Sequence, residues 1–269
     1  MSNHFVFIIP LTPDSHLTEL RSTLQKICLE TLLKQTYQNW TALLIGRDKP
    51  SNTEDPRFVH IAEEGLKELK LQIATKYIRE NALTFDYVIR LDDDDIINPS
   101  ALQKYKNSQA DAIVDLKHHF LDWHSQSVSS QFRPWFPNTI LHKFEHAMVK
   151  YGKIANRNIE QINDDVVLIE TNHSYMHDYY KGKKVLFSAA QRPVYVRVLN
   201  KDSITSSVND NYLDYLRTFG TWNKKLAWKS QINITPDQDQ ACSLKKKNMN
   251  LKSFIGAYIS QSRFKKDFK

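Results

Sequence analysis

The chain has 269 residues, enough for one large α/β domain or two small ones, each with its own apolar core. Apolar residues make up 41% and charged residues 25%, a composition that excludes wholesale disorder. No two of the six glycines lie within four residues of each other, which excludes both the Rossmann fingerprint and the P-loop. Cys28 and Cys242 form no C-x-x-C pair, so the sequence predicts neither a disulfide framework nor a cysteine zinc site, and a reducing compartment fits best.

The formal net charge of +7 resides at the end of the chain. Residues 245–269 contain eight basic side chains and one acidic one, and the preceding residues are neutral overall. No nucleic-acid-binding motif accompanies this charge, so we expect no nucleic-acid partner. Apolar residues within this tail follow helical spacing: Leu251, Phe254, Ile255, Tyr258 and Ile259. The pattern predicts a basic amphipathic helix that either lies on an anionic membrane or packs on its own domain.

The apolar run at residues 5–9 has no basic flank and ends at Pro10. It is too short for a signal peptide or a membrane span, and no longer apolar run follows. We therefore expect a cytoplasmic protein. It would contact the inner face of the cell membrane peripherally if the tail binds lipid.

Strand and helix signals alternate over the first hundred residues, which predicts a mainly parallel sheet flanked by helices. Strands are expected at residues 5–9, 40–45, 58–61 and 87–91. Amphipathic helices are expected from Leu17 to about Gln35 and, further on, along Leu66, Leu69, Ile73 and Tyr77. The rest of the sequence predicts a helix of about ten residues beyond Pro99 and a strand near residues 112–116. Loops or a small antiparallel part are expected over residues 118–137, and further strands at residues 185–187 and 194–198.

Four consecutive aspartates, residues 92–95, directly follow the fourth expected strand. Their mutual repulsion costs stability unless a cation compensates it. Open α/β sheets bind ligands beyond the carboxyl ends of their strands, and Mn²⁺ and Mg²⁺ prefer carboxylate oxygens. The run therefore predicts a divalent-metal site, and the alternative is a solvated acidic turn that caps the following helix.

Residues 5–102 resemble family 2 glycosyltransferases of the GT-A fold. The resemblance rests on the strand at residues 5–10, the Gln-Thr-Tyr-x-Asn-Trp stretch at residues 35–40, and the D-x-D at residues 92–94 with Pro99 and Leu102 downstream. Residues 193–197, with Ser203 and Thr205, more loosely resemble the segment that closes the family's catalytic domain. Phe136-Pro137-Asn138-Thr139, His173 and Gly182 more weakly resemble bacterial rhamnosyltransferases of polysaccharide synthesis.

This resemblance implies a GT-A-like catalytic domain over residues 1–200, followed by a helical, basic C-terminal extension over residues 201–269. It also implies a nucleotide-diphosphate-sugar donor, with Mn²⁺ or Mg²⁺ held by Asp92 and Asp94. Donor-binding residues by the same resemblance are Pro10, Asp48, Arg90, Asp92, Asp93 and Arg197. Asp48 stands near the family's base-contacting aspartate, although this chain reads Ile-Gly-Arg-Asp there. Arg90 either pairs with a donor phosphate or neutralises the acidic run.

An inverting transfer also needs a carboxylate that takes the proton of the acceptor hydroxyl. The resemblance favours Asp165, with Asp178 as the rival, while an Asn-Asp-Asp sequence at residues 163–165 is also good turn chemistry. His173 and His177 are four residues apart, so on a helix they share a face, and one is a candidate late metal ligand. An ordinary surface role is the alternative for both histidines.

The sequence thus predicts a metal-dependent hexosyl- or deoxyhexosyltransferase of bacterial surface polysaccharide synthesis, inverting, with a glycan or lipid-linked acceptor. A catalytically inactive GT-A-like binding module is one alternative. A zinc peptidase is another, because residues 142–146 read His-Lys-Phe-Glu-His and satisfy the H-x-x-E-H pattern. The α/β alternation around that pattern is not its expected context.

Overall fold

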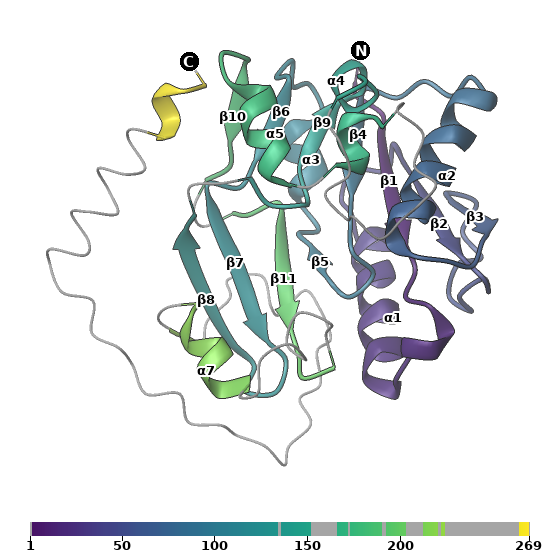
Figure 1. Cartoon of the computed structure of the whole chain (residues 1–269), viewed down its shortest axis with the longest axis vertical. Helices are drawn as coiled ribbons and strands as arrows, with labels where there is room; N and C mark the ends of the chain where they lie inside the picture. Colours follow the sequence, from purple (N-terminus) through teal and green to yellow (C-terminus); the bar gives the residue numbers. More distant parts are fainter. Residues whose placement is uncertain are drawn as a thin grey trace, which may run out of the picture.

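The computed structural model describes residues 2–133, 136–151, 166–171, 173–189, 192–202, 212–219, 222–223 and 264–268. Within these residues the chain forms two β-sheets with helices packed against them (Figure 1). The first sheet contains β1 (Phe5–Pro10), β2 (Trp40–Gly46), β3 (Phe58–Ala62), β4 (Tyr87–Arg90), β6 (Ala112–Val114), β9 (Leu141–Lys143) and β10 (Val185–Phe187). The second contains β5 (Ile96–Ile97), β7 (Lys117–Asp122), β8 (Ser127–Phe132), β11 (Tyr195–Leu199) and β12 (Trp222–Asn223).

The first sheet is mainly parallel, as the sequence predicts. Its strand order is β10-β6-β9-β4-β1-β2-β3, and β9 runs antiparallel to its neighbours β4 and β6. β1 pairs in parallel with both β2 and β4, so that Ile8 lies between Leu43 and Arg90. The carboxyl ends of β1 and β4 therefore meet at one edge of the sheet, where Leu11 and Leu91 leave it.

The central strand β1 is buried on both faces, which explains its unbroken apolar run. Phe5, Phe7 and Ile9 pack in one hydrophobic cluster with α1 (Glu19–Leu33), while Val6 and Ile8 pack in another with α2 (Lys67–Glu80). All five side chains are fully buried. Burial of each such side chain contributes about 1.5–3 kcal/mol of transfer free energy. Because α1 covers one face of β1 and α2 the other, both helices stabilise the position of the strand.

The second sheet continues from the acidic run. β5 follows the run directly and pairs antiparallel with β11, which pairs in parallel with β7. β7 and β8 form an antiparallel hairpin, and this confirms the small antiparallel part expected over residues 118–137. Further along the chain, α7 (Tyr212–Arg217) and β12 pack on this hairpin, with Phe219 against Phe120. Residues beyond 200 thus contribute to the second sheet.

Three of the expected helices differ in detail. α1 begins at Glu19 and leaves Leu17 outside, because the Thr18 hydroxyl accepts a hydrogen bond from Arg21 N (3.2 Å) and caps the helix there. The expected apolar face of α2 is half right: Ile73 and Tyr77 pack against the core beside the buried Leu71, Ala74 and Ile78, whereas Leu66 and Leu69 are 62% and 42% exposed. α3 spans Ala101–Tyr105 only, because the next residues turn, with Ser108 N bonded to Tyr105 O (2.9 Å). The remaining short helices are α4 (Phe144–Ala147) and α5 (His173–Tyr180), with 3-10 turns at Asp14–His16 and Leu168–Glu170.

The last described residues of the chain dock on the body of the protein, near α5 and β10 (Figure 1). Phe264 and Phe268 are buried, and their rings contact Phe136, His177 and Phe187. Gly182 N donates to Asp267 O (2.9 Å), which fixes the segment to the end of α5. The apolar positions 251–259 of the expected amphipathic helix lie outside the described residues. In the part of the chain that is described, none of the helices combines the length and apolarity that a membrane crossing requires.

We expect the Phe268→Ala substitution to lower the free energy of unfolding by about 3 kcal/mol, because it leaves a cavity between Phe136 and Phe187. For a chain of this size that corresponds to a fall in Tm of about 6–12 °C, measurable by calorimetry. Lys266→Ala is the matched control, because Lys266 lies exposed in the same segment. Equal Tm values for the two variants would mean that the segment does not pack on the core.

Candidate active site

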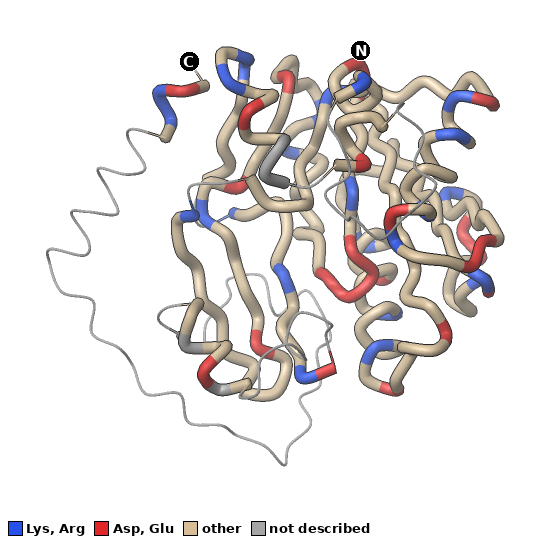
Figure 2. The backbone as a smooth tube through the Cα atoms, in the orientation of Figure 1, with Lys and Arg blue, Asp and Glu red and all other residues tan. Residues whose placement is uncertain are grey.

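A cavity of about 260 Å³ lies where the carboxyl ends of β1 and β4 meet. The turn that follows β4 crosses between the two sheets there and is the acidic stretch seen in Figure 2. Residues from β1, α1, α2, the aspartate run and β11 line the cavity: Pro10, Leu11, Thr12, Pro13, Arg21, Lys67, Lys70, Asp92, Asp93, Asp94, Asp95, Arg197 and Val198. The fold therefore brings the predicted residues Pro10, Asp92, Asp93, Asp94 and Arg197 to one place.

Two of the four aspartates hold neighbouring backbone in position. The buried Asp93 carboxylate accepts hydrogen bonds from Thr12 N (2.6 Å), Thr12 Oγ1 (2.9 Å) and Gln25 Nε2 (2.8 Å). Asp95, also buried, accepts one from Val198 N (2.9 Å). Asp93 thereby fixes the segment after β1 to the acidic turn, and Asp95 fixes β11 to it. Both carboxylates line the cavity, but the three bonds to Asp93 take up most of the hydrogen-bond acceptor capacity of its carboxylate.

The other two aspartates present partly exposed carboxylates to the cavity. Asp92 is ion-paired with Lys67, and Asp94 lies 3.3 Å from Arg21 Nη2. The exposed fractions of the two acidic side chains are 28% and 15%. Asp92 and Asp94 are thus the members of the run whose carboxylates are partly accessible to a ligand.

The two accessible carboxylates differ in their electrostatic environment. Burial raises the pKa of Asp92, but Lys67 and then Arg90 outweigh it and bring the pKa to about 2. Burial, followed by the charges of Asp93 and Asp92, raises the pKa of Asp94 to about 6. The ionised form of Asp94 is therefore disfavoured where it stands, and a further cation beside the carboxylate would favour that form.

Four basic side chains line the cavity beside the run, and sequence reasoning missed three of them. Arg197 was expected, whereas Arg21, Lys67 and Lys70 were not. Lys70 is buried and donates to Leu11 O (2.7 Å), and burial lowers its pKa. A signal did exist, because Lys67 and Lys70 lie in the first turn of α2, where the helix dipole disfavours cations. Lysines at such positions need anionic partners, here the acidic turn.

The donor set of this cavity fits a Mg²⁺ or Mn²⁺ ion that is shared with a phosphate group. Asp92 and Asp94 offer carboxylate oxygens, and such ions are typically held by one or two carboxylates together with substrate phosphates and water. In the described parts of the chain, three metal-ligating side chains with ligand atoms within 4.8 Å of one another occur at Asp111, Glu145 and His146 instead. The aspartate run alone therefore does not form a complete protein cage.

Several predicted site residues lie elsewhere. Asp48 is exposed beyond the end of β2 and does not line the cavity. Arg90 is buried and donates to Thr171 O (3.3 Å), close enough to Asp92 to lower the pKa of that carboxyl, which favours the neutralising role over a direct phosphate contact. Asp165 lies outside the described residues.

The helix predicted around His173 and His177 is present as α5, away from the cavity. His177 stacks on Phe264, with ring centroids 5.1 Å apart, and contacts Phe136. Asp178 is exposed and forms an ion pair with Lys181 (3.0 Å). The described residues therefore do not bring His177 or Asp178 to the aspartate run, and of His173 only the backbone is placed.

The two histidines of the H-x-x-E-H pattern do not share a helix, which counts against the zinc peptidase alternative. His142 lies on β9, fully buried, with Nδ1 2.8 Å from the Tyr180 hydroxyl, and burial lowers its pKa to about 3. His146 lies in α4, with Nδ1 2.7 Å from the Tyr179 hydroxyl. The two histidines therefore belong to different elements and form hydrogen bonds with the tyrosines of α5.

No family model and no curated protein matches this chain. Among solved structures, residues 1–349 of S. aureus TarS are similar to it, with 12% identity and a TM-score of 0.44 over 80% of this chain and 64% of that one. A longer S. aureus TarS structure gives 13% identity and the same TM-score, and this chain covers 39% of it. A proposed nucleotide-diphospho-sugar transferase from Desulfovibrio desulfuricans G20 gives 12% identity and a TM-score of 0.40 over 98% of this chain and 99% of that one. The chain thus spans less than two thirds of the TarS chains.

Proposed function

We propose that this chain is a metal-dependent glycosyltransferase that moves a sugar from a nucleoside-diphosphate donor to a glycan or lipid-linked acceptor. The observation that carries the proposal is the cavity in which Asp92 and Asp94 stand among Lys67, Arg21 and Arg197. Two accessible carboxylates surrounded by cations suit a ligand that combines a divalent ion with phosphate oxygens.

In this proposal the residues around the cavity have different roles in binding the nucleotide-sugar donor. A bound divalent ion supplies neutralisation of the negative charge that develops on the diphosphate as the glycosidic bond breaks. Asp92 and Asp94 hold that ion, while Lys67, Arg21 and Arg197 are placed to contact phosphate oxygens. Asp93 acts indirectly, because its hydrogen bonds to Thr12 hold the segment after β1 against the acidic turn. Arg90 adds buried positive charge behind Asp92.

Release of nucleoside diphosphate from nucleotide sugars tests the proposal. The full chain is incubated with UDP-, dTDP- and GDP-linked hexoses and deoxyhexoses, with Mn²⁺ or with EDTA, and the nucleotides are separated by chromatography. We expect release of one nucleoside diphosphate that depends on Mn²⁺ or Mg²⁺. Metal-dependent nucleotide binding without any release or transfer would favour the inactive binding module instead.

We further propose that transfer is inverting and that Asp165 takes the proton of the acceptor hydroxyl, in the synthesis of a bacterial surface polysaccharide. Asp178 is a weaker candidate, because it is exposed and paired with Lys181.

The Asp165→Asn substitution should leave nucleotide binding unchanged and lower turnover by about a hundredfold or more, the usual effect of losing a general base. Steady-state kinetics and a nucleotide titration on the same preparation measure both quantities. Asp178→Asn is the matched control, with turnover expected near that of the wild type. The assignment fails if Asp178→Asn loses turnover and Asp165→Asn does not.

A further inference from the structure

A second cavity, of about 350 Å³, adjoins the first. The two share Asp92, Asp95 and Arg197 as a common wall, so a molecule in one lies next to a molecule in the other. Its other lining residues come from the β7–β8 hairpin, the segment after it, β11, and α7 with the turn that follows: His118, Phe120, Arg133, Phe136, Pro137, Asn138, Tyr195, Tyr215, Thr218 and Phe219.

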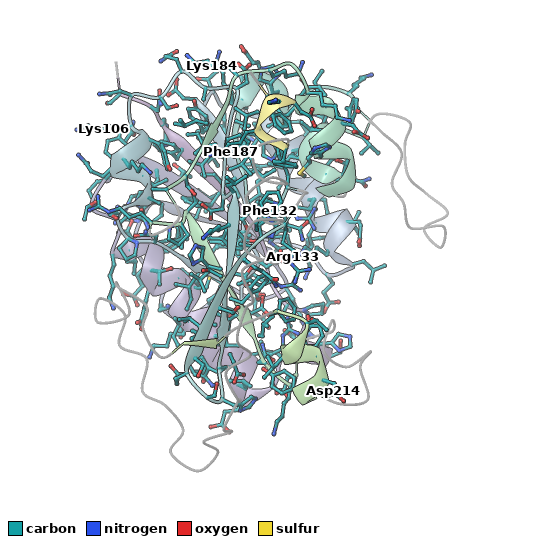
Figure 3. All side chains as sticks on the ribbon, turned by 90° about the vertical axis from the view of Figure 1, so that its left-hand side faces the viewer. Lys106, Phe132, Arg133, Lys184, Phe187 and Asp214 are labelled. Atoms are coloured by element: carbon teal, nitrogen blue, oxygen red, sulfur yellow. The ribbon has the colours of Figure 1, made fainter. Side chains whose placement is uncertain are left out.

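Arg133 is the charged residue that belongs to this cavity and not to the first. Its guanidinium carbon lies 5.7 Å from the ring centroid of Phe120 and 5.3 Å from that of Phe219. The two rings are buried and 4.5 Å apart, and Phe219 also contacts Tyr215. The rings of Phe120 and Phe219 form cation–π contacts with the guanidinium group and limit the rotamers that Arg133 samples. Figure 3 shows Arg133 at the end of the β8 strand, next to Phe132 and above Asp214.

The charges that act on Arg133 favour an anionic ligand beside it. Burial, and then the like charge of Arg197, lower the pKa of Arg133, so the two guanidinium groups repel each other. The carboxylates of the shared wall act on Arg197: burial lowers the pKa of Arg197, but Asp95 and, more weakly, Asp92 are among the groups that outweigh burial and raise it. An anionic group that binds between the two guanidinium groups would remove their repulsion and form charge-assisted hydrogen bonds.

We propose that the second cavity receives the sugar acceptor and that Arg133 binds a phosphate or carboxylate group of that acceptor. This inference rests on the proposed glycosyltransferase function, because only then must an acceptor hydroxyl reach the sugar of a donor in the first cavity. The shared wall of Asp92, Asp95 and Arg197 satisfies that need for proximity. The acceptor class is thus an anionic glycan, either a glycosyl phosphate or a chain that contains a uronic acid.

Binding of defined glycans to the full chain tests this inference. Three fluorescent oligosaccharides of equal length are used: one carries a phosphodiester, one a hexuronate, and one is neutral. Each is titrated with the protein in the presence of Mn²⁺ and UDP, dTDP or GDP. We expect one of the two charged probes to bind at least about tenfold more tightly than the neutral probe. The Arg133→Gln substitution should weaken that binding by about 10- to 100-fold, as loss of a charge-assisted contact does. Arg192→Gln removes an exposed arginine that lines neither cavity and should have no effect.

The arms of the experiment separate the two sources of negative charge and the two proposals. Preference for the phosphodiester probe assigns a phosphate-bearing acceptor, and preference for the hexuronate probe assigns an acidic sugar. Equal binding of all three probes, no binding of a charged probe, or an unchanged affinity in Arg133→Gln would overturn the inference. Titration of the nucleotide alone, on the same three proteins, should give equal affinities. If neither the wild type nor the two variants bind a nucleotide, the result would count against the glycosyltransferase proposal itself.

Discussion

Replacing Asp94 by asparagine is expected to abolish metal-dependent binding of nucleoside diphosphates. The side chain keeps its shape but loses the charge that, with Asp92, would hold the divalent ion. Because such an ion contributes several kcal/mol, we expect the nucleotide affinity in Mn²⁺ to fall by at least about 100-fold, and turnover to fall with it. Calorimetric titration of UDP, dTDP and GDP, each with Mn²⁺ or EDTA, measures the effect.

Glu64→Gln is the matched control for this prediction. Glu64 is an exposed acid whose carboxylate lies 3.3 Å from an arginine, Arg47, the same separation as between Asp94 and Arg21. Glu64 lines neither cavity, so the nucleotide affinity of the Glu64→Gln variant should equal that of the wild type. Circular dichroism confirms that each variant is folded. Wild-type affinity and turnover in Asp94→Asn would remove the aspartate run from the donor site.

Replacing Asp93 by alanine is expected to act on stability rather than on the ligand. The substitution leaves three donors without their acceptor, namely Thr12 N, Thr12 Oγ1 and Gln25 Nε2. Each hydrogen bond to a charged group stabilises the fold by about 1.5–3 kcal/mol. Removing Asp93 also removes its repulsion on Asp94, but this gain is smaller than the loss of the three hydrogen bonds. We expect a net loss of about 3 kcal/mol and a fall in Tm of about 6–12 °C.

Thermal unfolding of Asp93→Ala beside Asp48→Ala tests this assignment, because Asp48 is exposed and outside both cavities. The control should keep the wild-type Tm. Should Asp93→Ala keep its Tm and lose nucleotide binding, Asp93 would be a direct donor ligand, as the resemblance to family 2 glycosyltransferases implies.

The strands of the first sheet could be predicted because each is a local signal. β1 and β2 are apolar runs buried on both faces, and their bounds match the expected ones within a residue. The second sheet could be predicted only in part. The local β7–β8 hairpin and the strand β11 were expected, but β5 pairs with β11 across about a hundred residues of sequence, and the two-residue strand β5 has too short a pattern to indicate a partner. The expected face of α2 failed at Leu66 and Leu69 only, because Leu66 precedes the helix and Leu69 packs beside Gly65, at the exposed start of the helix.

The acidic half of the candidate site was evident in the sequence, whereas the basic half was evident only at Arg197. Four aspartates after a strand are locally improbable without a cation, so they stand out. Arg21, Lys67 and Lys70 occur singly on two helices, where isolated cations ordinarily face solvent. Only the parallel pairing of β1 with β4, and the packing of α1 and α2 on opposite faces, bring them to the acidic turn. The same holds for Arg133, whose neighbours Phe120 and Phe219 are a hundred residues apart.

An anomalous difference map from crystals of the full chain grown with Mn²⁺ and the nucleoside diphosphate that binds best tests the central claim most directly. We expect an Mn²⁺ peak at about 2 Å from a carboxylate oxygen of Asp92 or Asp94, with the diphosphate beside it and toward Lys67 and Arg21. A peak confined to Asp111, Glu145 and His146, or a nucleotide bound away from the aspartate run, would contradict the claim.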